Sequence, residues 1–306
     1  MKYVQYLIDQ VRSQTENTDF TDFTGIPTSE FIQYINDAQH SLQAAIAAQH
    51  PRVFMKETVI DIVNGQEKYD IPSDCYLGNK IHNVEYSATG AEDDFYVLDD
   101  TTIKSRVPGV TGAPIKYIRM SGKIMLVPQA TSGKLRINYI KRVREVDLRR
   151  AKVQSSPTVS STANWTLALD NANFLTETSS LQQHDYVTIV DRKGDILASN
   201  LPVINVGDEY IDIEPHTLQS GESIPANAFV VGGKDTSSHG EFDDSVERYI
   251  IAYCAWKILK RDSSEDSGEA AQELTIMLQD IVKSYALITD DVQTIPNLHS
   301  WDDWSF

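Results

Sequence analysis

The sequence contains little cysteine and has no long apolar run. Its 306 residues include two cysteines, Cys75 and Cys254, which are too few for a disulfide framework or a cysteine metal site. No stretch approaches the roughly 20 apolar residues of a membrane-spanning helix. Residues 1–12 also lack the apolar run of a secretory signal peptide. We therefore expect a soluble protein that is not exported and has no contact with a membrane.

Motifs of common enzymes are also missing. No G-x-x-x-x-G-K-[ST], G-x-G-x-x-G, G-x-S-x-G or H-E-x-x-H sequence occurs, and the seven histidines are scattered. Asp170–Asn173 resembles the start of a calcium loop, but Ala172 stands where an oxygen ligand is needed. We therefore predict no catalytic residue, no cofactor and no metal site.

Basic residues are outnumbered. The chain has 44 acidic and 27 basic side chains, which gives a formal net charge of −17. Proteins that hold nucleic acid neutralise phosphates with clustered lysine and arginine. Such an acidic chain would repel a duplex, and it suits a basic partner or a channel through which DNA slides.

Amphipathic helices are predicted near both ends. Val4, Leu7, Ile8 and Val11 recur with helical spacing, and a second helix begins near Thr28 and ends at His50-Pro51. Two further helices follow Asp243-Asp244-Ser245. Helices from both ends can bury their apolar faces on each other. We expect residues 1–50 and 240–290 to form one helical bundle.

The sequence between these helices is typical of β-structure. Residues 51–150 contain short alternating segments with turn signals at Asn64-Gly65 and Ser121-Gly122, which predict an antiparallel β-sandwich-like domain. The Glu67–Ile71 segment would return from the first of these turns. A Ser/Thr-rich boundary follows, and residues 155–235 predict a small inserted β-barrel with a hairpin tip near Gly194. The predicted fold class is α+β.

Aromatic residues mark two candidate partner-binding regions. The helix at 246–259 is apolar almost all round. Tyr253 and Trp256 therefore belong either to the core or to an interface with a neighbouring subunit. Residues 291–306 hold Trp301, Trp304 and Phe306 with little else to bury them. Such a segment usually docks on a partner.

One basic cluster lies in KRVREVDLRRAK, residues 141–152. It is either a solvated connector between domains or an electrostatic contact with an acidic partner, for which Arg149 and Arg150 would be ion-pair donors between subunits. DNA binding is disfavoured because Glu145 and Asp147 interrupt the cluster and no aromatic platform accompanies it.

The order of these parts resembles a protein family. The likeness rests on TSEFIQYINDAQHSLQAAI, on TVIDIVNGQEKYDIP with its Tyr69–Asp74 stretch, and on KYIRMSGKIMLVPQATSGKLRINYIKR with Ile124–Pro128 and Tyr139. A closing helix, DDSVERYIIAYCAWKILKRD, completes the pattern. These features are similar to those of head–tail adaptor (connector) proteins of tailed bacteriophages, including the tail tubular proteins of short-tailed phages. The likeness covers about residues 1–142 and 240–290.

The resemblance implies a structural virion protein at the head–tail junction, present in the host cytoplasm during assembly. It implies a homo-oligomeric ring, commonly twelve-fold, that joins the portal protein to a downstream tail or nozzle protein, with tail fibres as a further candidate partner. DNA would pass without specific binding. Two alternatives stay open. One is a binding module for a fibre or host glycan, with Trp165 and Tyr186 as exposed platforms. The other is a cell-wall hydrolase with two carboxylates roughly 5–9.5 Å apart.

Overall fold

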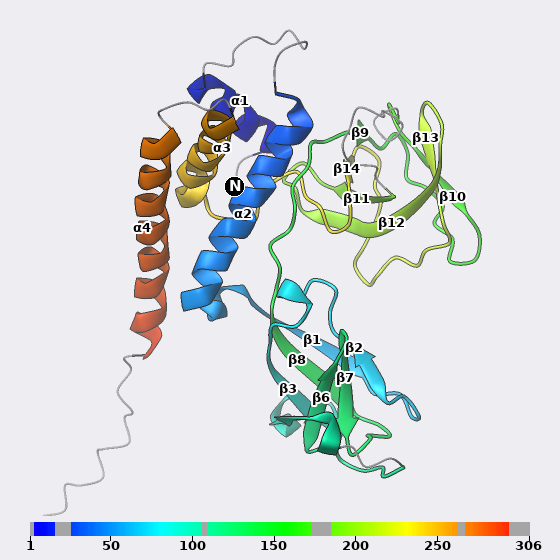
Figure 1. Ribbon diagram of the computed structural model, residues 1–306. Helices are drawn as coiled ribbons and strands as arrows, with labels where there is room; N and C mark the ends of the chain where they lie inside the picture. Colours follow the sequence, from blue (N-terminus) through cyan, green and yellow to red (C-terminus); the bar gives the residue numbers. More distant parts are fainter. Residues whose placement is uncertain (1–2, 16–25, 106–108, 173–184, 262–266, 294–306) are drawn as a thin grey trace, which may run out of the picture. The chain divides into compact units, whose positions relative to one another are not determined.

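The computed structural model describes residues 3–15, 26–105, 109–172, 185–261 and 267–293. The chain divides into two compact units. Unit 1 comprises residues 1–42 and 144–284, and unit 2 comprises residues 43–143 with 285–306. Figure 1 shows helices and a curved β-sheet in unit 1, and two smaller sheets in unit 2. The coarse prediction of mixed helices and antiparallel sheets is therefore confirmed.

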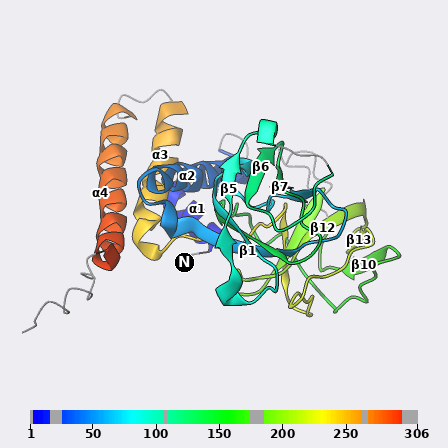
Figure 2. The same cartoon turned by 90° about the horizontal axis from the view of Figure 1, so that it is seen from below.

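Four α-helices lie near the two ends of the described chain. They are α1 (Val4–Gln14), α2 (Thr28–Gln49), α3 (Glu247–Arg261) and α4 (Ser267–Gln293). The apolar residues of α1 that the sequence pattern selects are all buried, and this helix packs against α3. Figures 1 and 2 both show α4 alongside α3. That all four helices form a single bundle stays a prediction.

Side-chain contacts attach α3 to α2. Arg261 Nη1 lies 2.8 Å from Glu30 Oε2, and Lys257 Nζ lies 3.6 Å from Asp37 Oδ2. The hydroxyl groups of Tyr249 and Ser41 lie 3.3 Å apart. The buried residues of α3 include Tyr249 and Ile251, which are two positions apart and so lie on different sides of the helix. Helix α3 is therefore covered on more than one side, as its sequence indicates.

The β-structure of unit 1 is a six-stranded antiparallel half-barrel sheet. Its order is β10-β13-β12-β11-β14-β9. The strands are β9 (Ala151–Lys152), β10 (Trp165–Ala168), β11 (Tyr186–Val190), β12 (Ile196–Val206), β13 (Tyr210–Ile213) and β14 (Phe229–Gly232). β10 and β9 are the two edge strands of this sheet. A bridge between Val153, next to β9, and Leu169, next to β10, links these edges. The buried interior includes Leu167, Ile189 and Val230.

Unit 2 contains two four-stranded sheets, with the orders β1-β8-β3-β4 and β2-β7-β6-β5. Their strands are β1 (Met55–Asp61), β2 (Lys68–Asp70), β3 (Ile81–Ser87), β4 (Tyr96–Val97), β5 (Asp99–Thr101), β6 (Lys116–Met120), β7 (Lys123–Val127) and β8 (Lys134–Ile140). Only the β5–β6 pair is parallel among the described strand pairs of this unit. One apolar core, which includes Tyr69, Leu126 and Ile137, is drawn from both sheets.

Two predicted turns have different outcomes. Ser121-Gly122 connects β6 and β7, with positive φ at both residues, so this hairpin is confirmed. Gly65 also has positive φ, +84°, but β1 and β2 enter different sheets. The returning strand pairs with β7 instead of β1, so the sequence predicts the turn correctly and its strand partner wrongly.

Short 3₁₀ helices occupy several connections: Pro51–Phe54, Tyr76–Gly78, Glu92–Asp94, Ile103–Ser105 and Asp244–Val246. The last of them leads into α3. Asp243 caps it by accepting a hydrogen bond from the backbone N–H of Ser245, at 2.9 Å. The predicted start of this helical segment is therefore confirmed at the level of its cap.

The chain before β9, residues 144–150, is held by backbone bonds on one side and by side chains on the other. The N–H groups of Asp147 and Arg150 donate to the carbonyls of Ser237 and Val230. The Asn36 side chain of α2 donates to the Val146 carbonyl at 3.1 Å and accepts from the Val146 N–H at 2.8 Å. Asp147, whose exposed fraction is 2%, accepts from Arg150 and from the Gly232 N–H at 3.0 Å. We name residues 144–150 the seam segment, because α2, β14 and the residues before α3 are all bonded to it.

We predict that Asp147→Asn lowers the free energy of unfolding of unit 1 by about 2 kcal/mol, because Arg150 loses its charged partner in a largely buried pair. The measurement is urea unfolding followed by tryptophan fluorescence, to which Trp165 and Trp256 of unit 1 contribute two of the four tryptophans of the chain. The control is Asp37→Asn. That carboxylate is 40% exposed, and its loss should cost below about 1 kcal/mol. Equal losses in the two variants would contradict a special role for Asp147.

Candidate partner-binding surfaces

The predicted partner-binding residues fall into three groups. Trp301, Trp304 and Phe306 lie outside the described residues. Tyr253 and Trp256 lie on α3, and Arg149 and Arg150 lie in the seam segment. All four described residues belong to unit 1.

Tyr253 and Trp256 form an aromatic pair on α3. Their ring centroids lie 5.5 Å apart in an edge-on arrangement, and both side chains are half-buried. Lys260 Nζ lies 5.1 Å from the Trp256 ring centroid, and Lys257 Nζ lies 5.4 Å from that of Tyr253. These rings are therefore partly covered by their own chain and remain partly accessible, with cations around them.

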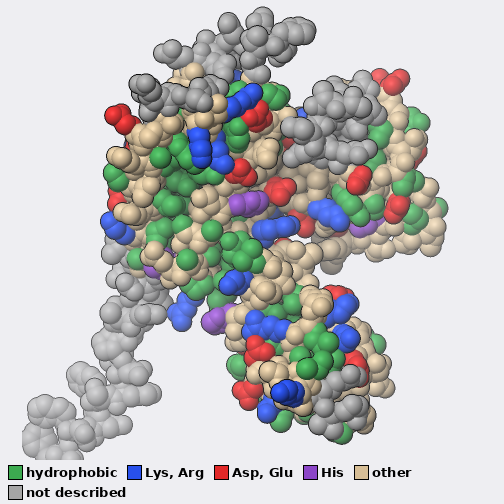
Figure 3. Space-filling view, in the orientation of Figure 1, with side chains coloured by type: hydrophobic (Ala, Val, Ile, Leu, Met, Phe, Trp, Pro, Cys, Tyr) green, Lys and Arg blue, Asp and Glu red, His purple; other side chains and the backbone are tan. Residues whose placement is uncertain are grey.

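A groove with a volume of about 460 Å³ opens between α1, α3 and α4. We name it the helical groove and define it by two residues from each helix: Tyr6, Gln10, Ala252, Trp256, Ala270 and Met277. The small side chains of Ala252 and Ala270 leave space that Trp256 and Met277 border. Figure 3 shows hydrophobic side chains gathered over the helical part of unit 1, with lysine and arginine among them.

Arg149 is held inside unit 1 by several groups. Its guanidinium carbon lies 4.7 Å from the Tyr3 ring centroid and 4.4 Å from that of Phe229. It donates hydrogen bonds to the Arg192 carbonyl and, at 3.4 Å, to Ser238 Oγ. Arg149 therefore attaches α1 and the β11–β12 hairpin to the seam segment and is not a freely solvated cation.

Arg150 also has an intrachain partner. Its guanidinium forms a two-pronged pair with Asp147, with Nη2 at 2.7 Å from Oδ1 and Nε at 3.0 Å from Oδ2. Arg144 pairs in turn with Glu241 at 3.2 Å. Much of the basic cluster is thus occupied with carboxylates and rings of its own chain. A contact of Arg149 or Arg150 with a second subunit stays a prediction.

Arg149 lies near His239 and contributes to a lowered pKa of its imidazole. The His239 ring packs 5.8 Å from the Tyr3 ring, and its Nδ1 lies 3.0 Å from Ser238 Oγ. A side chain at Gly194 would collide with this ring, because a Cβ there would lie 2.4 Å from Nδ1. Burial lowers the pKa of His239 below its usual 6.5, and the nearby positive charge of Arg149 lowers it further.

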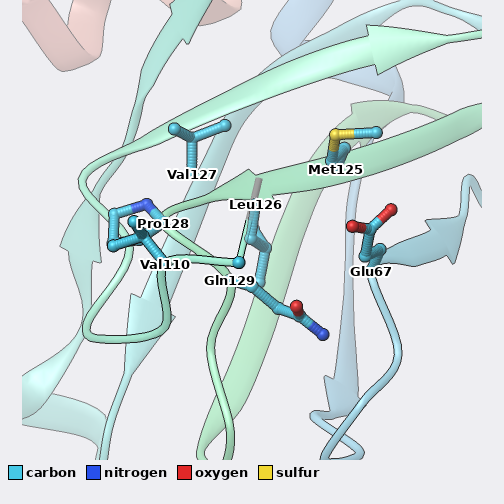
Figure 4. A pocket seen from close by; sticks show the side chains of 8 residues that line it. Glu67, Val110, Met125, Leu126, Val127, Pro128 and Gln129 are labelled. Carbon is cyan, nitrogen blue, oxygen red and sulfur yellow. The ribbon is translucent and has the colours of Figure 1, made fainter. Parts of the chain in front are cut away.

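A second cavity in the described part of the chain is too small for a ligand. A cavity beside β7, lined by Glu67, Val110, Met125 and Gln129 among others (Figure 4), has a volume of about 20 Å³, which is room for about one water molecule. Within the described ranges, no group of three histidine, cysteine or acidic residues is placed to hold a metal ion. No α-helix in the described parts is long and apolar enough to cross a membrane.

Trp165 and Tyr186, the residues suggested as exposed glycan platforms, differ in how far they are buried. Trp165 is only 5% exposed and belongs to the interior of the half-barrel. Tyr186 is half-buried, and Lys234 Nζ lies 3.8 Å from its ring centroid. The binding-module alternative is therefore wrong in requiring Trp165 as an exposed platform.

Sequence reasoning missed the amides of α2. Asn36 binds the seam segment, and Gln43, seven residues later, donates to the Lys141 carbonyl at 2.7 Å and accepts from the Val143 N–H at 3.0 Å. Asn36 is 8% exposed and Gln43 is 0% exposed. The sequence signal was the seven-residue spacing of Asn36 and Gln43, which places the two amide side chains on the same face of α2, two turns apart.

We predict that unit 1 loses stability as the pH falls below about 6.5, and that His239→Gln reduces this loss. A histidine whose folded pKa is depressed binds its proton more readily after unfolding, so its stabilising contribution is present above the unfolded pKa and disappears on acidification. The measurement compares urea midpoints at pH 7.5 and 5.5. His82→Gln, at an exposed position in unit 2, is the matched control and should leave the pH dependence unchanged.

Comparison with known proteins identifies the family of the chain. The family model "SU10 adaptor protein" matches residues 3–178. This range includes α1, α2, all strands of unit 2 and the first two strands of the half-barrel, β9 and β10. No curated protein matches the chain. Because the match covers more than half of the sequence, the chain belongs to the SU10 adaptor protein family of structural bacteriophage proteins.

Proposed function

We propose that this protein is the repeating subunit of an adaptor ring at the head–tail junction, joining the portal protein to the next tail component, with DNA passing through the ring. The observation that carries the proposal is the adaptor-family match over residues 3–178. Family membership establishes a structural role among virion components. The ring, its twelve-fold symmetry, the portal contact and the short-tailed phage setting are our extension of that role.

The helices support this arrangement. Helix α1, near the start of the chain, packs on α3, which lies more than 230 residues later in the sequence. We propose that residues 1–50 and 240–290 act as one helical assembly domain. Residues 51–150 and 155–235 would be its two β domains, and residues 291–306 would be a docking segment. A surface made from both ends of the chain is suited to repeated contacts between copies.

The charges support passage of DNA. The chain carries a formal charge of −17, and Arg144 and Arg150 pair with carboxylates of their own unit. Few cations of this cluster therefore remain for phosphate groups. An acidic lining would keep a moving duplex from adhering to the ring.

Arg149 and Arg150 would contact a neighbouring copy only through donors that their intrachain partners leave available. Tyr253 and Trp256 are better placed for such a contact, because both rings are half-buried and Trp256 borders the helical groove. The aromatic segment with Trp301, Trp304 and Phe306 would supply the remaining contact with a partner.

Deletion of residues 296–306 should leave a folded subunit that no longer joins its partner. The urea midpoint of the shortened chain, measured beside that of the full chain, checks that the subunit stays folded. Native mass measurement of the subunit, alone and mixed with the portal protein of its phage, should show loss of the assembled species.

The matched control for this deletion is the full-length Trp301→Ala/Trp304→Ala/Phe306→Ala variant, which keeps the chain length. It should fail in the same way if the aromatic side chains make the contact. Assembly that proceeds unchanged in both variants would remove the docking role of this segment.

The protein should bind duplex DNA weakly and with little dependence on salt. Each phosphate neutralised by the protein contributes about −0.9 to the slope of log K against log salt concentration. We expect a slope near zero in anisotropy measurements with a labelled duplex between about 50 and 200 mM salt. Tight binding that collapses across this range would contradict passive passage of DNA.

A further inference from the structure

Strand β1 has the longest open edge among the described sheets. It has seven residues and stands at one end of the order β1-β8-β3-β4, beside β8 (Figure 1). The other edge strands of the described sheets, β2, β4, β5, β9 and β10, have four residues or fewer. A sheet edge presents N–H and carbonyl groups to which another extended chain can bond. Strand β1 therefore offers room for an added strand.

The register of β1 shows which of its backbone groups are directed at the open edge. The Phe54 carbonyl and the Ile62 N–H bond to the residues on either side of β8, so the even-numbered residues of β1 are directed at β8. The backbone groups of Glu57, Val59 and Asp61 are therefore directed away from it. Within the described ranges, no backbone group bonds to these three residues.

The side chains of the same three residues form an exposed row. Side chains alternate along a strand, and Ile60 is directed at the apolar core of unit 2. The side chains of Glu57 and Asp61 are 63% and 83% exposed, and Val59 is 45% exposed. The open edge of β1 thus carries an acidic, an apolar and a second acidic side chain in a row.

The two carboxylates of this row have only distant cations. Glu57 Oε2 lies 3.9 Å from Arg136 Nε, and Asp61 Oδ1 lies 3.8 Å from Lys134 Nζ, which in both cases exceeds hydrogen-bonding distance. Arg136 also pairs with two further glutamates, so three carboxylates share its single charge. Lysine or arginine on an added strand would stand opposite these carboxylates and gain ion pairs.

A second copy of this edge is a poor partner. If two β1 strands paired antiparallel about Val59, Glu57 of one copy would stand opposite Asp61 of the other. Like charges in directly opposite positions destabilise a strand pair. The edge strand β5 begins with Asp99-Asp100 and would add further negative charge. The acidic row therefore disfavours pairing between copies through these edges.

A matching strand needs two basic residues, four positions apart, with an apolar residue midway. In this chain the spacing occurs at residues 52–56 and 257–261. Lys56 of the first segment already pairs with Asp74. The second segment lies in α3 and is helical. The pattern therefore favours a segment from a different protein.

We propose that the open edge of β1 binds an extended segment of a different virion protein, in which basic residues at positions i and i+4 flank an apolar residue at i+2. The segment adds a strand to the sheet, with its basic residues opposite Glu57 and Asp61 and its apolar residue opposite Val59. The inference goes beyond the adaptor ring and does not depend on it, because it uses only a surface of unit 2. Membership of the adaptor family supplies the virion setting.

Hydrogen exchange of the full-length chain tests the proposal. The probe is the peptide Thr-Lys-Thr-Val-Thr-Lys-Thr with both ends blocked, which places two lysines and the valine on one face. With the peptide bound, the N–H groups of Glu57, Val59 and Asp61 should exchange about tenfold more slowly, as measured by NMR. Failure of the peptide to bind, or binding that leaves these three amides unprotected, would overturn the proposal.

A peptide of the same composition provides the control for charge alone. Lys-Lys-Thr-Val-Thr-Thr-Thr carries the same net charge but places its lysines on opposite faces. It should bind about tenfold more weakly in calorimetric titration, because only one lysine can stand opposite an acidic residue of the row. Equal affinity of the two peptides would show a general attraction to carboxylates and would contradict strand addition.

A proline variant tests the bonding of the backbone. Val59→Pro removes an N–H that is directed at the open edge and breaks no bond to β8. It should weaken peptide binding at least about tenfold, whereas the matched Val59→Thr variant keeps this N–H and should bind within about twofold of the natural chain. Circular dichroism of both variants checks that they fold. Equal binding by the two folded variants would contradict the proposal.

Charge variants keep the test independent of the proline. Glu57→Gln/Asp61→Asn should weaken binding about tenfold, while Asp99→Asn on β5, in the other sheet of unit 2, should leave it unchanged. Equal effects of these variants would overturn the proposal. Protection of the same amides that rises with protein concentration in the absence of peptide would do so as well, because it would identify a second copy as the partner.

Discussion

The seam segment depends on buried side chains that complete the hydrogen bonding that its backbone bonds to Ser237 and Val230 begin. Buried N–H and carbonyl groups must be hydrogen-bonded. Around Val146 this requirement is met by Asn36, and the neighbouring Asp147 accepts both from Arg150 and from the Gly232 N–H. The half-barrel, α2 and the residues before α3 therefore share one short stretch of chain.

Electrostatics restrict how copies of this protein can associate. A chain with a formal charge of −17 repels its own copies, although salt screens this repulsion beyond about 8 Å. Association therefore needs contacts at close range, where apolar burial and local charge pairing operate. The helical groove offers apolar surface from Trp256 and Met277, and its charged lining residues are of both signs: Glu247, Arg248 and Glu273. The cations of the seam segment are less suitable because carboxylates and rings of their own chain already surround them.

Local patterns predicted the helices and turns well, while partner choice was less predictable. The apolar spacing from Val4 to Val11 defines the buried face of α1, and Ser121-Gly122 defines a hairpin, since both depend on neighbouring residues. Placement of β2 against β7 depends on contacts across some fifty residues, which no turn signal encodes. The inward position of Arg149 follows from rings at Tyr3 and Phe229, both distant in sequence. In the sequence alone, the basic cluster that contains Arg149 therefore looked like a solvent-exposed connector.

The apolar circumference of α3 illustrates how far sequence can constrain a site. Its composition required burial on several sides and left open whether the last side belonged to the core or to a partner. In the structure, α1 and α2 cover part of the helix, and Cys254 and Ile258 are buried there. The side with Tyr253 and Trp256 is only half-buried, and Trp256 faces a groove. Because water would otherwise contact this apolar wall, a partner that excludes water from it gains free energy roughly in proportion to the area covered.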